Sequence, residues 1–161
     1  MEPQIQTSTE IKLIGNKIRM SLANNQTVKL WQGFMPRRKE VTNTSNPKHF
    51  YSVEVYDDTT FFQNFSPTNE FEKWAAVPVT NFDTIPAEMD TLTIPAGEYA
   101  VFLYKGKSSD GPKFYQYIFG QWLPNSDYQL DDRPHFALMD ERYKGEDPNS
   151  EEELWIPIRK K

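Results

Sequence analysis

The residues of this chain best suited to chemistry are aromatic rings, which occur in two matching sets. The segment LWQGFMP at 30–36 is echoed by IFGQWLP at 118–124, and aromatic residues make up 14% of the 161 residues. Rings offer stacking faces for a ligand as well as surface for a core. Each ring taken alone fits a core position better, but the recurrence of one aromatic face favours a binding site. The rings concerned are Trp31, Phe34, Phe119 and Trp122.

The elements that must position these rings also recur in order. Each half contains an apolar-aromatic helix end, a His-Phe strand start and an aliphatic-Pro-aliphatic strand. These landmarks lie at 30–36, 49–50 and 77–79 in the first half and at 118–124, 135–136 and 156–158 in the second. We therefore predict a single domain, residues 1–161, with internal strand-helix-strand-strand repeats at about 8–82 and 88–160. The expected class is α+β, with a curved antiparallel sheet and two helices around a central ligand groove.

Two amphipathic helices are predicted from apolar residues at helical spacing. The first follows a polar stretch at 23–26 and is expected to stop at Pro36, and the second runs from about Asp110 to Pro124. The predicted strands are 10–22, with a bend or bulge at Gly15, and 50–56, 74–79, 89–94, 99–104, 136–142 and 154–158.

Composition argues against several classes of function. The chain has no cysteine and a net charge of −5, and its only basic clusters, 37–39 and 159–161, are short. We expect no thiolate metal site, no cofactor and no direct nucleic-acid binding. Neither a signal sequence nor a long apolar run is recognisable, so we expect a cytoplasmic protein without membrane contact. The segment KGKS at 105–108 lacks the leading glycine of a phosphate loop, because residue 101 is valine.

Three motifs carry a resemblance to a known family. IPAGEYAV at 94–101, QWLPNSDY at 121–128 and ELWIPI at 153–158 resemble the GyrI-like small-molecule-binding family, over about residues 5 to 160. That family includes the effector-binding domains of AraC-type and multidrug-sensing transcription activators. The resemblance implies two repeats around a groove that takes amphipathic, often cationic or aromatic, compounds. No DNA-binding head is recognisable in the sequence, so a stand-alone form is expected.

The sequence departs from the family at one position. Many relatives carry a Pro-x-Phe-Glu pattern whose glutamate is the buried acid of the pocket, and here residues 134–137 read PHFA. A buried carboxylate selects cations or serves as a general base, and Ala137 can do neither. Three explanations fit: the pocket is neutral, another acid substitutes, or the alanine is engineered. We expect Glu141 to substitute, on the same strand face as Ala137, with an exposed salt bridge as the alternative role.

The leading hypothesis is a protein that sequesters or senses a small hydrophobic, aromatic and possibly cationic compound. Side chains alternating along 51–55 and along 137–141 are expected to face each other across the groove. The predicted ligand-binding residues are Trp31, Phe34, Tyr51, Val53, Phe119, Trp122, Ala137, Met139, Glu141 and Trp155.

Two alternatives stay open. One is a hydrolase of strained, cyclopropanoid toxins, in which Tyr51 or Tyr99 donates a proton and an acid such as Glu141 orients water. Ala137 would weaken or disable such an enzyme. The other is a protein-interaction module that binds gyrase or a transcription regulator.

Overall fold

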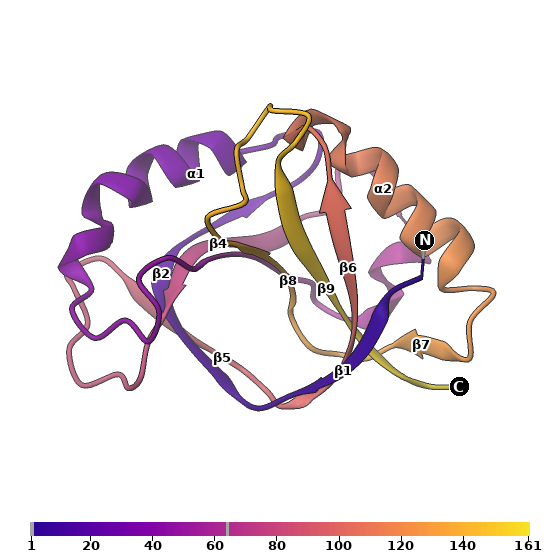
Figure 1. Cartoon of the computed structure of the whole chain (residues 1–161), viewed down its shortest axis with the longest axis horizontal. Helices are drawn as coiled ribbons and strands as arrows, with labels where there is room; N and C mark the ends of the chain where they lie inside the picture. Colours follow the sequence, from indigo (N-terminus) through magenta and orange to yellow (C-terminus); the bar gives the residue numbers. More distant parts are fainter. Residues whose placement is uncertain (1, 64) are drawn as a thin grey trace.

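The computed structural model describes residues 2–63 and 65–161 and shows one strongly curved, nine-stranded antiparallel sheet with two helices (Figure 1). The strand order is β1-β6-β9-β8-β3-β4-β2-β5, and β7 pairs with β9 beside this path. The strands are β1 (Gln4–Ser8), β2 (Ile11–Met20), β3 (Phe50–Val55), β4 (Phe71–Pro78), β5 (Asp90–Ile94), β6 (Gly97–Lys105), β7 (Tyr128–Leu130), β8 (His135–Met139) and β9 (Glu151–Lys160). The helices are α1 (Thr27–Phe34) and α2 (Gly111–Tyr117), with short helical segments η1 (Met35–Glu40), η2 (Thr59–Phe62), η3 (Ser108–Asp110) and η4 (Ile118–Trp122).

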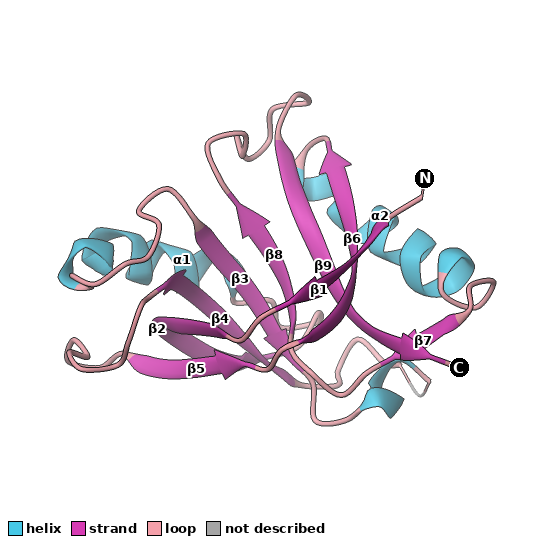
Figure 2. Cartoon of the chain, turned by 60° about the horizontal axis from the view of Figure 1, so that its bottom comes forward, coloured by secondary structure: helices cyan, strands magenta, loops and turns pink. Residues whose placement is uncertain are grey.

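Both helices pack against the same face of the sheet, which we name the helix face (Figure 1). Leu30 and Phe34 of α1 pack on the strands of the first half, and Ile118, directly after α2, packs on those of the second. The opposite face, the inner face, lies inside the curve of the sheet, as Figure 2 shows. It carries a separate core that includes Trp74 and Phe136.

The observed elements confirm the predicted α+β class. Each half contributes a strand, a helix and two strands: β2, α1, β3 and β4, then β6, α2, β8 and β9. The leading strands are exchanged, because β1 pairs with β6 of the second half and β5 pairs with β2 of the first. The residue limits of the proposed repeats stay a prediction.

The prolines act differently in the two helices. The α-helix α1 ends at Phe34, just before Pro36 as predicted, and the chain continues as the 3₁₀ segment η1, which holds Pro36 in its first turn, where a missing N–H costs nothing. The second helix changes to a π-helical turn in η4 and ends at Trp122, before Pro124 as predicted. No side-chain cap from Gln26 precedes α1, although Asn25 Oδ1 accepts a hydrogen bond from the Thr27 amide at 2.9 Å.

Gly15 does not form a bulge, one of the two features predicted for it. The register between β2 and β4 is continuous from Leu13 to Met20. A Cβ atom at Gly15 would lie 2.0 Å from the Ala75 carbonyl oxygen and 2.6 Å from the Ala76 Cα. The glycine is therefore needed for the close approach of two strands.

The strand predicted at 136–142 ends at Met139, and this corrects the expectation for Glu141. Glu141 lies in the turn beyond β8, where its carboxylate is 3.3 Å from Lys48 Nζ and both side chains are exposed. Strand parity cannot place a residue beyond the strand end, so Glu141 does not share a face with Ala137. The alternative role, an exposed salt bridge, is what the structure shows.

Candidate functional site

The register between β3 and β8 divides the predicted ligand-binding residues between two faces. Ser52 pairs with Ala137, and Tyr51 pairs with Leu138. Because paired residues share a face and neighbours alternate, Ala137 lies on the helix face and Tyr51 on the inner face. The expectation that both line one groove was wrong. The helix face holds Trp31, Phe34, Phe119, Trp122, Ala137 and Met139, and the inner face holds Tyr51, Val53, Tyr99 and Trp155.

Most of the predicted rings pack into the core. Phe34 is fully buried between α1 and the sheet, and Val53 is fully buried on the inner face. Trp31 meets Phe34 edge to face at 5.9 Å, and Trp122 packs against Phe102 at 5.2 Å in the same manner. These rings therefore contribute mainly to the packing of the cores on the two faces.

Three charged side chains converge on the helix face between the two helices. Lys73 Nζ lies 2.8 Å from Glu54 Oε1, and these side chains are only 9% and 14% exposed. The third is Glu152 of β9, whose carboxyl group feels the charges of both Glu54 and Lys73. Such burial is costly for each charge unless it is compensated.

Glu152 is the uncompensated member of this group. Burial, followed by repulsion from Glu54, raises the pKa of the Glu152 carboxyl from 4.5 to about 7, and the charge of Lys73 opposes the rise. Within the described part of the chain Glu152 forms no ion pair. It can therefore hold or release a proton near neutral pH.

The floor between the two carboxylates is made of small residues. Ala137 lies between its strand partners Ser52 and Leu154. Glu54 lies two residues beyond Ser52 along β3, and Glu152 lies two residues from Leu154 in the opposite direction. The two carboxylates thus approach the Ala137 floor from opposite ends.

Aromatic side chains surround these charges. Phe119 of η4 stacks on Phe62 of η2 at 4.3 Å between ring centroids, and on Tyr115 of α2 at 6.2 Å. Burial, followed by the charge of Glu54, raises the pKa of the Tyr56 and Tyr115 hydroxyls well above 10.0. We name the group Glu54, Lys73, Ala137, Glu152, Tyr56, Tyr115, Phe62 and Phe119 the acid–aromatic site.

His135 lies beneath these rings, with its ring centroid 4.9 Å from Tyr56, 5.8 Å from Phe62 and 6.0 Å from Phe119. Burial, aided by the charge of Arg133, lowers the pKa of the imidazole to about 3. His135 therefore stays neutral and supports the rings.

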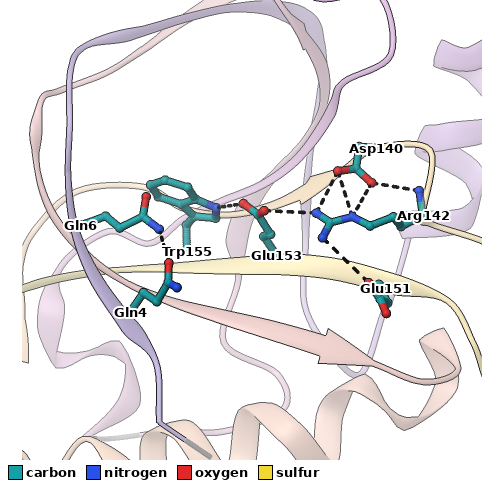
Figure 3. Close-up of polar contacts among 7 residues, drawn as sticks. All are labelled: Gln4, Gln6, Asp140, Arg142, Glu151, Glu153 and Trp155. Atoms are coloured by element: carbon teal, nitrogen blue, oxygen red, sulfur yellow. Dashed lines mark hydrogen bonds and ion pairs between the residues drawn. The ribbon is translucent and has the colours of Figure 1, made fainter.

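The inner face carries a different arrangement around Glu153 (Figure 3). Glu153 accepts hydrogen bonds from Trp155 Nε1 at 3.0 Å and from Arg142 Nη2 at 3.1 Å. Arg142 also pairs with Asp140 at 2.8 Å, and Figure 3 shows how its guanidinium joins the turn after β8 to β9. Each carboxylate in this network has Arg142 as a direct partner, and the network joins the turn after β8 to β9, so it is best explained as a support for the β8–β9 hairpin.

The two tyrosines predicted as proton donors belong to this inner face. Burial, followed by the charge of Glu153, raises the pKa of Tyr51 to about 12. Burial also raises the pKa of Tyr99, against the opposing charge of Arg133, whose guanidinium carbon lies 4.5 Å above the tyrosine ring. Both lie on the face opposite to Glu152, so neither joins the acid–aromatic site.

Sequence reasoning missed the charged residues of this site, although a signal for them existed. An acidic run such as 151–153 is typical of a solvated turn, yet Glu152 alternates in phase with the buried Leu154 and Ile156. Glu54 alternates out of phase with Tyr51, and the pairing of Ser52 with Ala137 places it on the same face as Ala137.

Two surface depressions lie outside the acid–aromatic site. One, of about 470 Å³, is lined by the chain start and by residues of α2 and η4, among them Ile5 and Tyr117. The other, of about 290 Å³, is lined by polar residues that include Lys48 and Glu141. Among the described residues, no helix has the length and apolarity needed to cross a membrane.

Comparison with known proteins places these features in a family. The model of the GyrI-like small molecule binding domain matches residues 1–159. The transcriptional regulator BrlR of Pseudomonas aeruginosa is 26% identical over 159 residues, which cover 98% of this chain and 56% of BrlR. The chain therefore spans just over half the length of that relative.

Solved structures share the fold at low sequence identity. SAV2435 bound to tetraphenylphosphonium superposes with a TM-score of 0.73 at 17% identity, covering 99% of this chain and 94% of that one. A hydrolase encoded by lin2189 of Listeria innocua superposes with a TM-score of 0.59 at 9% identity, covering 98% and 92%.

Proposed function

The chain belongs to the GyrI-like small molecule binding domain family, and we propose that its acid–aromatic site binds an aromatic, positively charged small molecule. The observation that carries the proposal is Glu152, a half-buried carboxyl group without an ion-pair partner among the described residues. A cation beside it would favour the ionised form and offset its burial. The bound compound would be sequestered or sensed.

The surrounding residues support this ligand class. Phe62, Phe119 and Tyr115 form an aromatic stack near the carboxylates, and aromatic rings attract cations. Ala137 is buried in the apolar cluster against which Tyr115 and Phe119 pack. SAV2435 binds tetraphenylphosphonium, an aromatic cation, which agrees with a site of this kind.

Glu152 also accounts for the missing family acid. At the position where the family resemblance predicts a buried glutamate, this chain has Ala137. We propose that Glu152, two residues along β9 from the strand partner of Ala137, supplies the carboxylate instead. The earlier candidate, Glu141, lies exposed in a turn and pairs with Lys48.

Calorimetric titration tests the proposal with three compounds that share one ring system. They are protonated N,N-dimethyl-1-naphthylmethylamine, its N-trimethyl quaternary analogue and neutral 1-naphthylmethanol. We expect at least one cation to bind at least tenfold more tightly than the alcohol, and Glu152→Gln to remove that preference. Glu141→Gln deletes an exposed carboxylate and serves as the matched control. Equal affinity for the cations and the alcohol in the wild-type protein would refute the proposal.

A hydrolytic role is the second candidate, and one observation favours it. A carboxyl group with a pKa of about 7, close to the Tyr115 hydroxyl, meets the requirement for general acid–base catalysis near neutral pH. In this version Glu152 orients and deprotonates water, while Tyr115 takes the place expected for Tyr51 or Tyr99. Mass spectrometry of a cyclopropane-bearing electrophile incubated with the protein should show addition of one water, and Glu152→Gln should abolish it. An unchanged electrophile after prolonged incubation excludes this role.

BrlR is a transcriptional regulator, but this chain spans 56% of it. Binding to a transcription regulator or to gyrase stays a prediction from the family resemblance.

A further inference from the structure

The Glu54 carboxylate is only half satisfied. Its Oε1 atom lies 2.8 Å from Lys73 Nζ, whereas its Oε2 atom is buried and accepts no hydrogen bond. An ionised carboxylate accepts several hydrogen bonds, and a buried acceptor left without one is costly. The structure therefore holds an unused acceptor inside the acid–aromatic site.

The groups facing this oxygen do not supply the missing donor. Lys73 is engaged with the other oxygen, and the Tyr56 and Tyr115 hydroxyls interact with Glu54 through its charge. Two neighbours remain: Glu152 repels it, and His135, the strand partner of Glu54, forms no hydrogen bond with this oxygen. A donor that brings positive charge would satisfy the oxygen and relieve this repulsion together.

The charge balance of the site agrees with a ligand of one positive charge. The charges of Glu54 and Lys73 cancel each other. Without a ligand, the three side chains together are therefore neutral only when Glu152 is protonated. One bound cation permits Glu152 to ionise, because two carboxylates then face one lysine and one ligand cation. Both states are balanced, and binding exchanges a proton for the ligand.

We infer that the charged group of the ligand is a hydrogen-bond-donating ammonium or amidinium, which donates to Glu54 Oε2. The inference rests on the proposed function and narrows its substrate class. A quaternary cation carries the same charge but no N–H, so it would leave the oxygen unpaired and press alkyl groups against it. The chain therefore discriminates between cations by hydrogen bonding as well as by charge.

The decisive comparison uses the wild-type protein and two of the naphthyl compounds. At pH 7.5 the tertiary amine is protonated and donates one N–H, whereas the quaternary analogue donates none. We expect the tertiary cation to bind at least tenfold more tightly, the effect of one charge-assisted hydrogen bond. Equal affinity, or tighter binding of the quaternary cation, overturns the inference while leaving the proposed function intact. If neither cation binds more tightly than the neutral alcohol, the proposed function itself fails.

A pair of double variants locates the effect. Glu54→Gln with Lys73→Met keeps the net charge of the chain and removes the anionic acceptor, so the preference for the tertiary cation should fall below threefold. Glu141→Gln with Lys48→Met makes the same exchange at an exposed ion pair and should leave the preference unchanged. A persistent preference in the first variant, with near-wild-type circular dichroism, would overturn the assignment to Glu54. If that variant does not fold, the comparison of the tertiary and quaternary cations on the wild-type protein decides whether the inference holds.

Discussion

Replacing Glu152 by glutamine should stabilise the protein in a manner that depends on pH. Burial and Glu54 raise the pKa of the Glu152 carboxyl from 4.5 to about 7. A raised pKa means that the folded protein holds this proton more tightly than the unfolded chain does. The stability contributed by the protonated acid is therefore complete below pH 4.5 and is lost as the pH rises through 7.

The size of the effect follows from the shift between 4.5 and about 7. Each pKa unit corresponds to about 1.4 kcal/mol, which sets an upper value of about 3 kcal/mol for the cost of ionising Glu152 in the folded protein. Because the side chain is partly exposed, solvent screening lowers this figure, and we expect about 1 to 3 kcal/mol. Glutamine has nearly the same shape as glutamic acid but does not ionise, so the variant avoids the cost of a charge at this position.

Urea unfolding at a series of pH values from 4.5 to 8.5 measures the difference. The free energy of unfolding of Glu152→Gln, minus that of the wild type, should rise between pH 4.5 and 7.5 and then level off. Glu141→Gln, in an exposed turn, should give a small difference with little dependence on pH. A difference for Glu152→Gln that stays constant across this range would refute the argument that Glu152 is buried beside a second carboxylate.

Two further perturbations test the packing. Gly15→Ala should destabilise the protein by roughly 2 kcal/mol or more in urea unfolding, because the new Cβ would lie 2.0 Å from the Ala75 carbonyl oxygen; wild-type stability would show that β2 and β4 can separate at no cost. Phe119→Ala should admit water beside His135 and move the pKa of its imidazole upward from about 3, as followed by NMR titration of the ring protons; an imidazole that still does not titrate above pH 4.5 would show that Phe119 does not shield it.

The sequence was informative wherever a residue's own strand or helix decides the outcome. Alternation and helical spacing predicted the main strands and both helices, since these depend on local periodicity. The short strands β1 and β7 escaped because their few residues show no clear period, and the close approach at Gly15 depends on a strand more than 50 residues away.

The acid–aromatic site could not be predicted because it depends on register. Parity relates Ala137 to Met139 within one strand, but only the pairing of Ser52 with Ala137 brings Glu54 to the same face. β8 ends at Met139, and directly after it Asp140 Oδ1 accepts a hydrogen bond from the Arg142 amide in a local turn. Local patterns determine which residues of one strand share a face. The register between strands determines which residues of the neighbouring strands lie on that same face.

The exchange of leading strands joins the two halves through backbone hydrogen bonds as well as through side-chain packing. Because β1 completes the second half and β5 completes the first, each half borrows one edge strand from the other's chain segment. Parting them would expose two rows of unpaired backbone groups, each able to capture a strand from a neighbouring molecule. Joining both halves in one polypeptide makes the exchange intramolecular and keeps the two partners at high effective concentration. The covalent link thus favours pairing of these strands within one molecule over pairing between molecules.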